Sequence, residues 1–121
     1  MEEKTKCQIS SSMKDGVLEL VVAGALTTIN LEDALNEGNT IVKDSNATKA
    51  IVDFRACCTR IDPLDLYRYI RKYDFAVFEI QYAVVSLPEK AKYRDAAINA
   101  GLKSLKWFSN IDEARAWLKS E

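Results

Sequence analysis

The chain has 121 residues and a formal net charge of −1, with 48% hydrophobic and 29% charged residues. This length fits one domain, spanning residues 1–121, that can bury a core without metals or disulfides, and the mixed charges argue against disorder. Nucleic-acid binding depends on an excess of Lys and Arg, which the chain lacks, so we expect no nucleic-acid partner.

Two extended runs, residues 7–13 and 17–23, open the chain. Asp15 and Gly16 separate them, and both residue types tolerate the positive φ of a tight turn, so the sequence predicts an antiparallel hairpin. A later apolar run, residues 49–55, predicts a third, buried strand. With a helix between them, the second and third strands are most simply a right-handed unit with parallel strands.

The helix between these strands is predicted to begin after Asn30, which can cap it, with Glu32 and Asp33 near the positive end of its dipole. An apolar stripe at helical spacing runs along it, and one glycine, Gly38, falls on that stripe. The stripe consists of Leu31, Ala34, Leu35, Ile41 and Val42.

A second helix is predicted to begin at Asp62 and Pro63, which suit an N-cap and the first helical position, and to run to about Tyr73. Residues 74–80 are rich in apolar side chains. They either extend this helix or form a loop.

The rest of the chain alternates strands and helices. Residues 81–87 and 103–108 are predicted strands, with a helix from Pro88 to Gly101 between them. A final helix begins at Asn110, with a glutamate three residues later as in a capping box. The order ββαβαβαβα predicts an α/β fold: a mixed, mainly parallel sheet with an N-terminal antiparallel hairpin and helices packed on it.

This order resembles the STAS fold, specifically the SpoIIAA-like family of small uncharacterised bacterial proteins. The likeness covers nearly the whole chain as a pattern and rests on the hairpin, on residues 23–26, 50–54 and 83–86, and on the tail, residues 108–118. The tail is the most specific part, with an aromatic strand end followed by Glu-Ala and Trp-Leu in the last helix.

The resemblance implies a regulatory domain bound by another protein. Antagonist-type members are bound by a kinase that phosphorylates a Ser at the start of the second helix, which matches residues 61–66 here. Asp62 fits that motif, but Pro63 and Leu64 occupy the acceptor positions and carry no hydroxyl. The phosphorylation switch is therefore not implied. Other relatives are modules of transporters and sensors, or are suspected of binding nucleotides or lipids.

The sequence shows neither an export signal nor a membrane span. Residues 1–6 are charged and lead into no apolar segment. The longest apolar stretch, residues 17–26, is well short of the roughly 20 residues that cross a bilayer. Three irregularly spaced cysteines indicate free thiols in a reducing compartment, so we expect a cytoplasmic protein.

The chain has no His, which removes the usual general base and most zinc sites, and we expect no cofactor and no metal. Cys57 and Cys58 are adjacent rather than two residues apart, which excludes a thioredoxin-type motif. Two interpretations of them remain. They are small, partly buried apolar residues, or one is a reactive thiol near Arg55 or Arg60.

Response-regulator receivers place an Asp, a Ser or Thr and a Lys as Asp53, Ser86 and Lys106 are placed here. They also need acidic residues after the first strand to hold magnesium. Here a hairpin follows the first strand and residues 24–27 follow the second, with no carboxylates among them. The sequence therefore argues against a receiver.

Cys57 and Cys58 are expected where the third strand ends and a loop begins. The loop from Cys57 to Asp62 and residues 86–88 are expected to form a ligand rim, because adjacent parallel strands end there. Thr59, Arg60 and Ser86 could hydrogen-bond a small polar or anionic ligand there, although Asp62 would repel an anion. No Gly-rich phosphate loop is present, and a plain solvated loop is the alternative.

Aromatic residues crowd the second predicted helix and the segment after it. They are Tyr67, Tyr69, Tyr73, Phe75 and Phe78. One helix face cannot bury them all, and exposed aromatics mark contact with a partner or lipid. The alternative is a longer helix that buries every one. The basic strip of Arg68, Arg71 and Lys72 is interpreted as a solvated face.

The leading hypothesis is a non-enzymatic regulatory or protein-interaction domain, with a protein partner or a second copy as its ligand. Its candidate binding residues are Cys57, Cys58, Thr59, Arg60, Asp62, Ser86, Tyr67, Arg68 and Arg71. The alternative is a small-ligand protein, for lipid or nucleotide, with an apolar pocket beside residues 75–80. An exposed aromatic patch would favour the first and an enclosed cavity the second. A cysteine-based enzyme would need Cys57 or Cys58 in a cleft.

Overall fold

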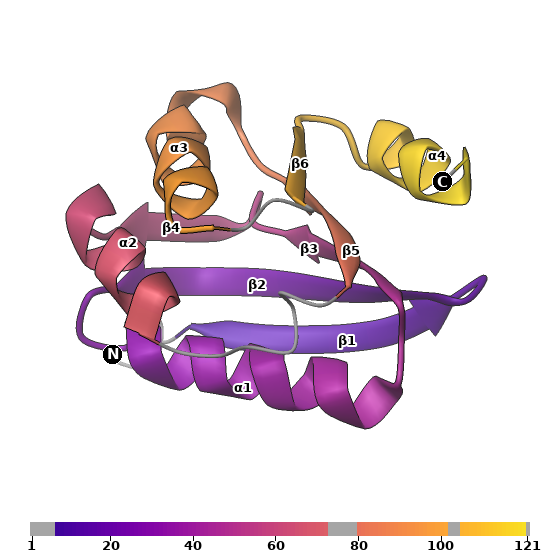
Figure 1. Cartoon of the computed structure of the whole chain (residues 1–121), viewed down its shortest axis with the longest axis horizontal. Helices are drawn as coiled ribbons and strands as arrows, with labels where there is room; N and C mark the ends of the chain where they lie inside the picture. The colour runs from indigo at the N-terminus through magenta and orange to yellow at the C-terminus, as the bar shows by residue number, and fades with distance from the viewer. Residues whose placement is uncertain (1–6, 73–79, 102–104, 121) are drawn as a thin grey trace.

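The computed structural model of the chain describes residues 7–72, 80–101 and 105–120. Within these residues a mixed sheet carries helices on both faces (Figure 1). The strands are β1 (Gln8–Lys14), β2 (Val17–Thr27), β3 (Lys49–Asp53), β4 (Cys57–Arg60), β5 (Gln81–Val85) and β6 (Leu105–Phe108). The helices are α1 (Leu31–Ser45), α2 (Pro63–Lys72), the 3-10 turn η3 (Pro88–Lys90), α3 (Ala91–Asn99) and α4 (Ile111–Ser120).

The sheet has the order β1-β2-β3-β5-β6, with β4 paired to β2 beside this path. β1 and β2 form an antiparallel hairpin, and the other pairings are parallel. The hairpin turn has a φ of 53° at Asp15 and 81° at Gly16, as the Asp-Gly sequence predicts. The predicted α/β class, with its N-terminal hairpin and mainly parallel sheet, is confirmed.

The sequence-based prediction is wrong at β4. It gives a loop over residues 57–62, where the structure has this strand. β4 runs parallel to Gly24–Thr27, the second half of β2. β3 reaches only Leu18–Val21, so the backbone of the second half of β2 needs another partner. Gly24 lies between the two halves with a φ of 91°, which glycine adopts without steric cost, and its N–H donates to Ala56 O at 3.2 Å.

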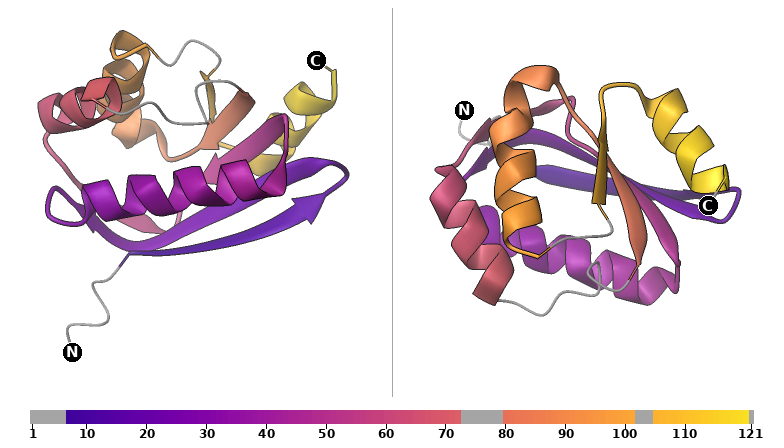
Figure 2. Two further views of the ribbon diagram at one scale, coloured as in Figure 1. Left: turned by 60° about the horizontal axis from the view of Figure 1, so that its bottom comes forward. Right: turned by 45° about the horizontal axis from the view of Figure 1, so that its top comes forward.

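The sheet separates two apolar layers. Helices α1, α2 and α3 cover one face, and α4 covers the other (Figure 2). Successive strand residues point to opposite faces, so Val84 packs under the three helices while Val85 packs under α4. The α4 side is a compact cluster of Ile51, Ala83, Val85, Ala114 and Leu118.

Capping residues begin two helices as predicted and act differently at a third. Asn110 Oδ1 accepts the N–H groups two and three residues later, at 2.8 and 3.1 Å, and Asp62 Oδ1 accepts the N–H two residues later at 2.9 Å. Asn30 makes no side-chain cap on α1. Its side chain instead accepts from Thr27 N at 2.8 Å and donates to Ala25 O at 2.9 Å, which closes the loop before the helix.

Several predicted boundaries shift. The helix expected from Pro88 begins as the 3-10 turn, and α3 starts at Ala91. β3 and β5 each end two residues before the expected boundary. Residues 73–79 lie outside the described residues, so the open question about segment 74–80 and the placement of Tyr73, Phe75 and Phe78 lie there too.

Candidate functional site

The nine predicted site residues do not form one site. Five are exposed at the surface: Cys58, Arg60, Asp62, Arg68 and Arg71. Two are buried, Cys57 and Ser86, and two are half-buried, Thr59 and Tyr67. Thr59 and Ser86 line an apolar pocket instead of joining the exposed group. The structure therefore separates a surface candidate from an interior one.

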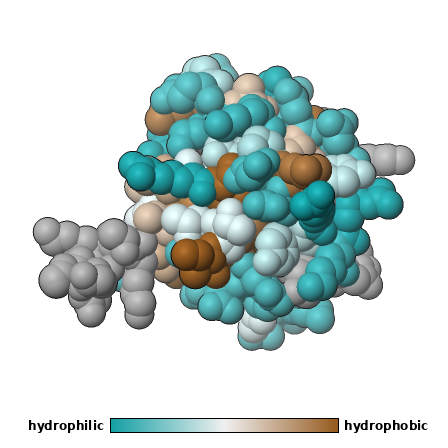
Figure 3. Space-filling model, turned by 90° about the vertical axis from the view of Figure 1, so that its left-hand side faces the viewer, coloured by the Kyte–Doolittle hydropathy of each residue, from teal (hydrophilic) through white to brown (hydrophobic). Residues whose placement is uncertain are grey.

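Two loops lie side by side where β2 and β4 end. Thr27 pairs with Arg60 in parallel register, so the loop from β2 to α1 and the loop from β4 to α2 leave the sheet together. Ile29 in the first loop is 95% exposed, and Leu64 at the start of α2 is 52% exposed. Together with Asp62 and Arg60 they form what we call the loop surface. Figure 3 views this side of the protein, where hydrophobic side chains stand among hydrophilic ones.

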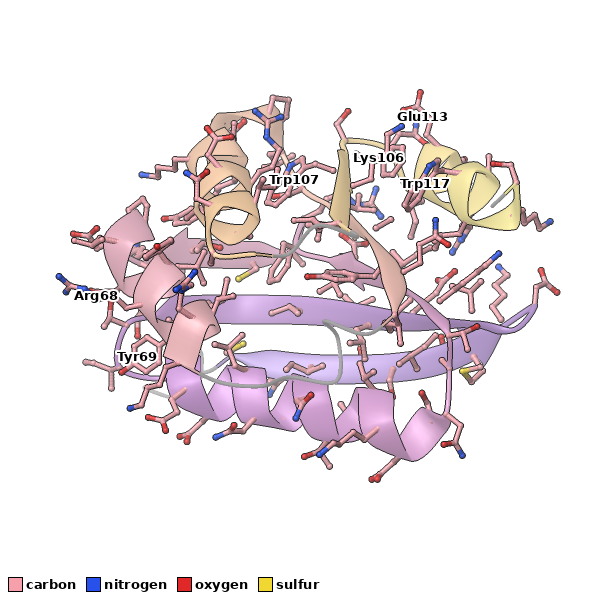
Figure 4. The ribbon with its side chains drawn as sticks, in the orientation of Figure 1. Arg68, Tyr69, Lys106, Trp107, Glu113 and Trp117 are labelled. Carbon is pink, nitrogen blue, oxygen red and sulfur yellow. The ribbon has the colours of Figure 1, made fainter. Side chains whose placement is uncertain are left out.

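Helix α2 continues the loop surface with charged side chains. Arg68 points away from the protein body, as Figure 4 shows, and its guanidinium lies 3.9 Å from the Asp65 carboxylate. Arg71 lies over the Tyr67 ring, 6.0 Å from its centroid. Tyr67 and Tyr69 are half-buried and pack against the apolar clusters under α2. Among the described residues, the exposed apolar side chains on this side are therefore aliphatic rather than aromatic.

An apolar cavity of about 190 Å³ lies between the sheet and helices α1, α2 and α3. Leu20, Val84 and Trp107 line it from the sheet, while Leu35 and Ile70 line it from the helices. The sequence predicts a pocket beside residues 75–80; residues 75–79 lie outside the described residues, and the described lining includes Leu66 and Ile70 of α2.

Gly38 of α1 also lines this cavity. A Cβ atom placed on Gly38 would meet no neighbouring heavy atom within 4 Å. The glycine on the predicted apolar stripe of α1 thus leaves open space at a position where a side chain would fit.

Polar groups at the cavity wall are few. Tyr93 Oη accepts a hydrogen bond from Ile61 N at 3.4 Å and donates one to Thr59 O at 3.3 Å. Trp107 differs, because its Nε1 is buried and has no hydrogen-bond partner among the described residues. Ser86, which also lines the cavity, is 3% exposed.

The cysteines occupy three different environments and are free. Cys57 is buried in β4, with its Sγ 3.4 Å from Thr59 Oγ1, and Cys58 is exposed on the same strand. Cys7 is half-buried, and burial, followed by the nearby Cys57 and Glu37, raises the pKa of its thiol. The adjacent pair predicted at a strand end therefore lies within a strand, with its two side chains on opposite faces.

Asp53, Ser86 and Lys106 do not converge. Asp53 is buried, and its carboxylate accepts hydrogen bonds from Arg55 N, Nε and one terminal guanidinium nitrogen at 3.0, 3.0 and 2.8 Å. Burial alone would raise the pKa of Asp53. The hydrogen bonds and the positive charge of Arg55 together outweigh this effect, so the pKa of Asp53 lies below its usual value. Ser86 faces the cavity, whereas Lys106 lies on the α4 side of β6, 5.7 Å from the Trp117 ring centroid (Figure 4).

Sequence reasoning missed three features of these sites: the exposure of Ile29, the open space at Gly38 and the unpaired Nε1 of Trp107. Only Gly38 left a signal, as a glycine on an otherwise apolar helical stripe. Among the described residues, no group of three or more His, Cys, Asp or Glu is arranged to hold a metal ion. No helix of the described ranges is long and apolar enough to cross a membrane.

No protein-family model matches the sequence, and no curated protein matches it. Solved structures do match the fold. An anti-sigma factor antagonist from Mycobacterium paratuberculosis is 17% identical, with a TM-score of 0.66 over 95% of this chain and 96% of that one. An uncharacterised protein of the DUF3478 family from Shewanella loihica, described as having a SpoIIAA-like fold, is 16% identical, with a TM-score of 0.59 over 93% of each chain. The chain has the SpoIIAA-like (STAS) fold.

Proposed function

We propose that this chain is a non-enzymatic regulatory domain that binds another protein through the loop surface and the outward side of α2. The observation that carries the proposal is Ile29, a large aliphatic side chain that is 95% exposed in the loop that leaves the sheet together with the loop leading to the half-exposed Leu64. Exposed apolar side chains rimmed by polar ones are typical of protein-interaction sites. The structural likeness to an anti-sigma factor antagonist supports a regulatory role of this kind.

The start of α2 supports recognition without a phosphorylation switch. Pro63 and Leu64 provide no hydroxyl at the positions where antagonist-type domains carry the phosphorylated Ser. The exposed Leu64 makes this turn apolar instead. The proposed contact therefore does not depend on a charge added at these positions. We also propose a cytoplasmic location for the domain, because its free thiols would stay reduced there.

Site-specific photo-crosslinking in cells tests the proposal. A photoreactive residue at position 29 should give one discrete crosslinked product with another protein. The same residue at position 98, where Ile98 is 46% exposed on α3, serves as the control and should not give that product. The Leu64→Ser substitution should weaken the product at position 29, because it removes the neighbouring apolar contact. Identical patterns from positions 29 and 98 would contradict the proposal.

Native mass spectrometry distinguishes a second copy of the chain from another protein as the partner. A dimer of the purified protein that is lost in the Ile29→Ser variant would assign the loop surface to self-association. A monomer that still crosslinks through position 29 would assign it to a different protein.

A further inference from the structure

The six arginines of the chain fall into two groups. Three of them donate hydrogen bonds to a carboxylate of the chain itself: Arg55 to Asp53, Arg94 to Asp95 and Arg115 to Glu19. The other three, Arg60, Arg68 and Arg71, have no hydrogen-bonded carboxylate among the described residues. These three follow one another on β4 and α2, the elements that carry the proposed protein contact.

Two of these arginines share one face of α2. Leu64, Arg68 and Arg71 occupy positions i, i+4 and i+7 of the helix, which places them in one row. All three are exposed, whereas Ile70 is buried on the other side of the helix. The exposed face therefore has one apolar residue followed by two basic ones, over about 10 Å of helix.

Both guanidiniums keep donors that the described residues do not use. The Arg68 guanidinium lies 3.9 Å from the Asp65 carboxylate, beyond hydrogen-bond distance, and its side chain is 67% exposed. Arg71 lies over the Tyr67 ring, 6.0 Å from the centroid, a contact that uses the flat face of the guanidinium and leaves its N–H groups free of it. A guanidinium presents its N–H groups as a planar fork that matches a carboxylate. The face is therefore suited to carboxylates from another molecule.

The surroundings favour separate carboxylates over a dense array of anions. Asp62 is exposed and Asp65 is half-buried at the start of the same helix, and the whole chain has a net charge of −1. Nucleic acids and anionic membranes present many charges at once and are bound by a surplus of cations, which this face does not offer. Carboxylates spaced one helical turn apart can meet Arg68 and Arg71 one by one.

We propose that this face of α2 binds a protein segment that carries one apolar residue and two carboxylates about one helical turn apart. The apolar residue packs on Leu64, and the carboxylates accept hydrogen bonds from Arg68 and Arg71. This inference rests on the proposed function, because it names the chemistry of the partner at that surface.

A peptide titration of the wild-type protein tests the inference without any variant. The probe is an alanine-based helical peptide with Leu, Glu and Glu at positions i, i+4 and i+7, and its matched control has Gln in place of both Glu residues. The Glu peptide should shift the NMR signals of the Arg68 and Arg71 Nε–H groups more than that of Arg94, whose Nε already donates to Asp95 at 3.3 Å. No shift, or equal shifts with the two peptides, would overturn the inference.

Phosphatidylserine vesicles provide the test against a membrane. The protein should not sediment with these vesicles at physiological salt. Sedimentation that is lost in the Arg68→Glu variant would assign the face to a lipid surface and overturn the proposed acidic protein segment.

A charge reversal tests the inference in cells. Arg68→Glu should weaken the crosslinked product obtained from position 29 by about tenfold, because it places a carboxylate opposite the carboxylates of the partner. Arg94→Glu makes the same change on α3, at a side chain that is 42% exposed, and should leave the product unchanged. An undiminished product in Arg68→Glu would overturn the acidic partner and leave the proposed protein contact intact. A wild-type protein that gives no product at position 29 would contradict the proposed function and this inference with it.

Discussion

The Arg115 guanidinium of α4 donates two hydrogen bonds to the Glu19 carboxylate of β2, from Nε at 2.8 Å and from a terminal nitrogen at 2.9 Å. The two residues are 96 positions apart in the sequence. Such a two-point contact fixes both the distance and the orientation of the partners, so it ties the last helix to the second strand of the N-terminal hairpin. Glu19 interrupts an apolar run in the sequence, and this pairing explains why a carboxylate is tolerated there.

The Glu19→Gln substitution should lower the free energy of unfolding at pH 7 by about 1–2 kcal/mol. Fully buried hydrogen bonds to charged groups stabilise a folded protein by more than this amount. Here the Arg115 side chain is 35% exposed, so water screens the pair and reduces its contribution. Urea denaturation measures the difference, and Glu89→Gln at an exposed position is the control. A loss no greater than that of the control would contradict this role of the pair.

The same contact predicts a pH dependence. Hydrogen bonds from Arg115 lower the pKa of Glu19 in the folded state, against a smaller opposing effect of burial. The stabilisation is therefore complete above the unfolded-state pKa of Glu, about 4.3, and is lost as the pH falls through the lower folded-state pKa. The stability difference between wild type and Glu19→Gln should shrink below about pH 4. A constant difference from pH 7 to pH 3 would contradict the lowered pKa.

Asp53 should resist phosphorylation. Its carboxylate is buried and already accepts three hydrogen bonds from Arg55, and no described group of acidic residues is arranged to hold magnesium beside it. Incubation with acetyl phosphate and magnesium, followed by intact-mass measurement, should show no modification that depends on Asp53. A mass increase in wild type that disappears in Asp53→Asn would revive the receiver interpretation.

Two glycines should respond to alanine in opposite directions. Gly38→Ala should raise the free energy of unfolding by about 0.5–1 kcal/mol, because alanine favours a helix interior and its methyl group enters open space. Gly24→Ala should lower it by about 1–2 kcal/mol, because a φ of 91° is costly for any residue with a Cβ atom. Thermal and urea denaturation of the two variants check the prediction, and changes of the same sign would contradict it.

Cys58 should be the first thiol to react with a maleimide at neutral pH. It is exposed, whereas Cys57 is buried and Cys7 is half-buried with a raised thiol pKa. Since the thiolate is the reactive form, the other two cysteines should label slowly. Cys58→Ser should remove the fast phase seen by mass spectrometry. A fast phase that persists in this variant would assign the reactivity to Cys7 or Cys57.

Local signals account for what the sequence predicted well. The Asp15-Gly16 turn needs only two neighbouring residues with positive φ, and Asn110 caps α4 through N–H groups two and three positions away. β4 escaped prediction because its four residues have little hydrophobic pattern of their own. Its existence depends on the unpaired half of β2, more than 30 positions earlier, which no local pattern reports.

In the candidate site, too, local sequence predicts some features while others depend on tertiary contacts. Exposure of Arg60, Asp62 and Arg68 follows from their charge, so sequence alone places them at the surface. The exposure of Ile29 could not be inferred this way, because an aliphatic residue beside a helix start is ordinarily expected to pack inward. The cavity depends on how the sheet and three helices meet, a property of tertiary packing that periodicity does not encode.

β2 pairs with β3 along its first half and with β4 along its second half, and these two partners are held in the sheet to different degrees. β4 pairs with β2 alone among the described strands, whereas β3 is held on both sides by β2 and β5. An element held on one side opens more readily than one held on two, so amide hydrogens of β4 should exchange with deuterium sooner than those of β3. We therefore expect the segment that carries Arg60 and leads into α2 to open before the central strands do.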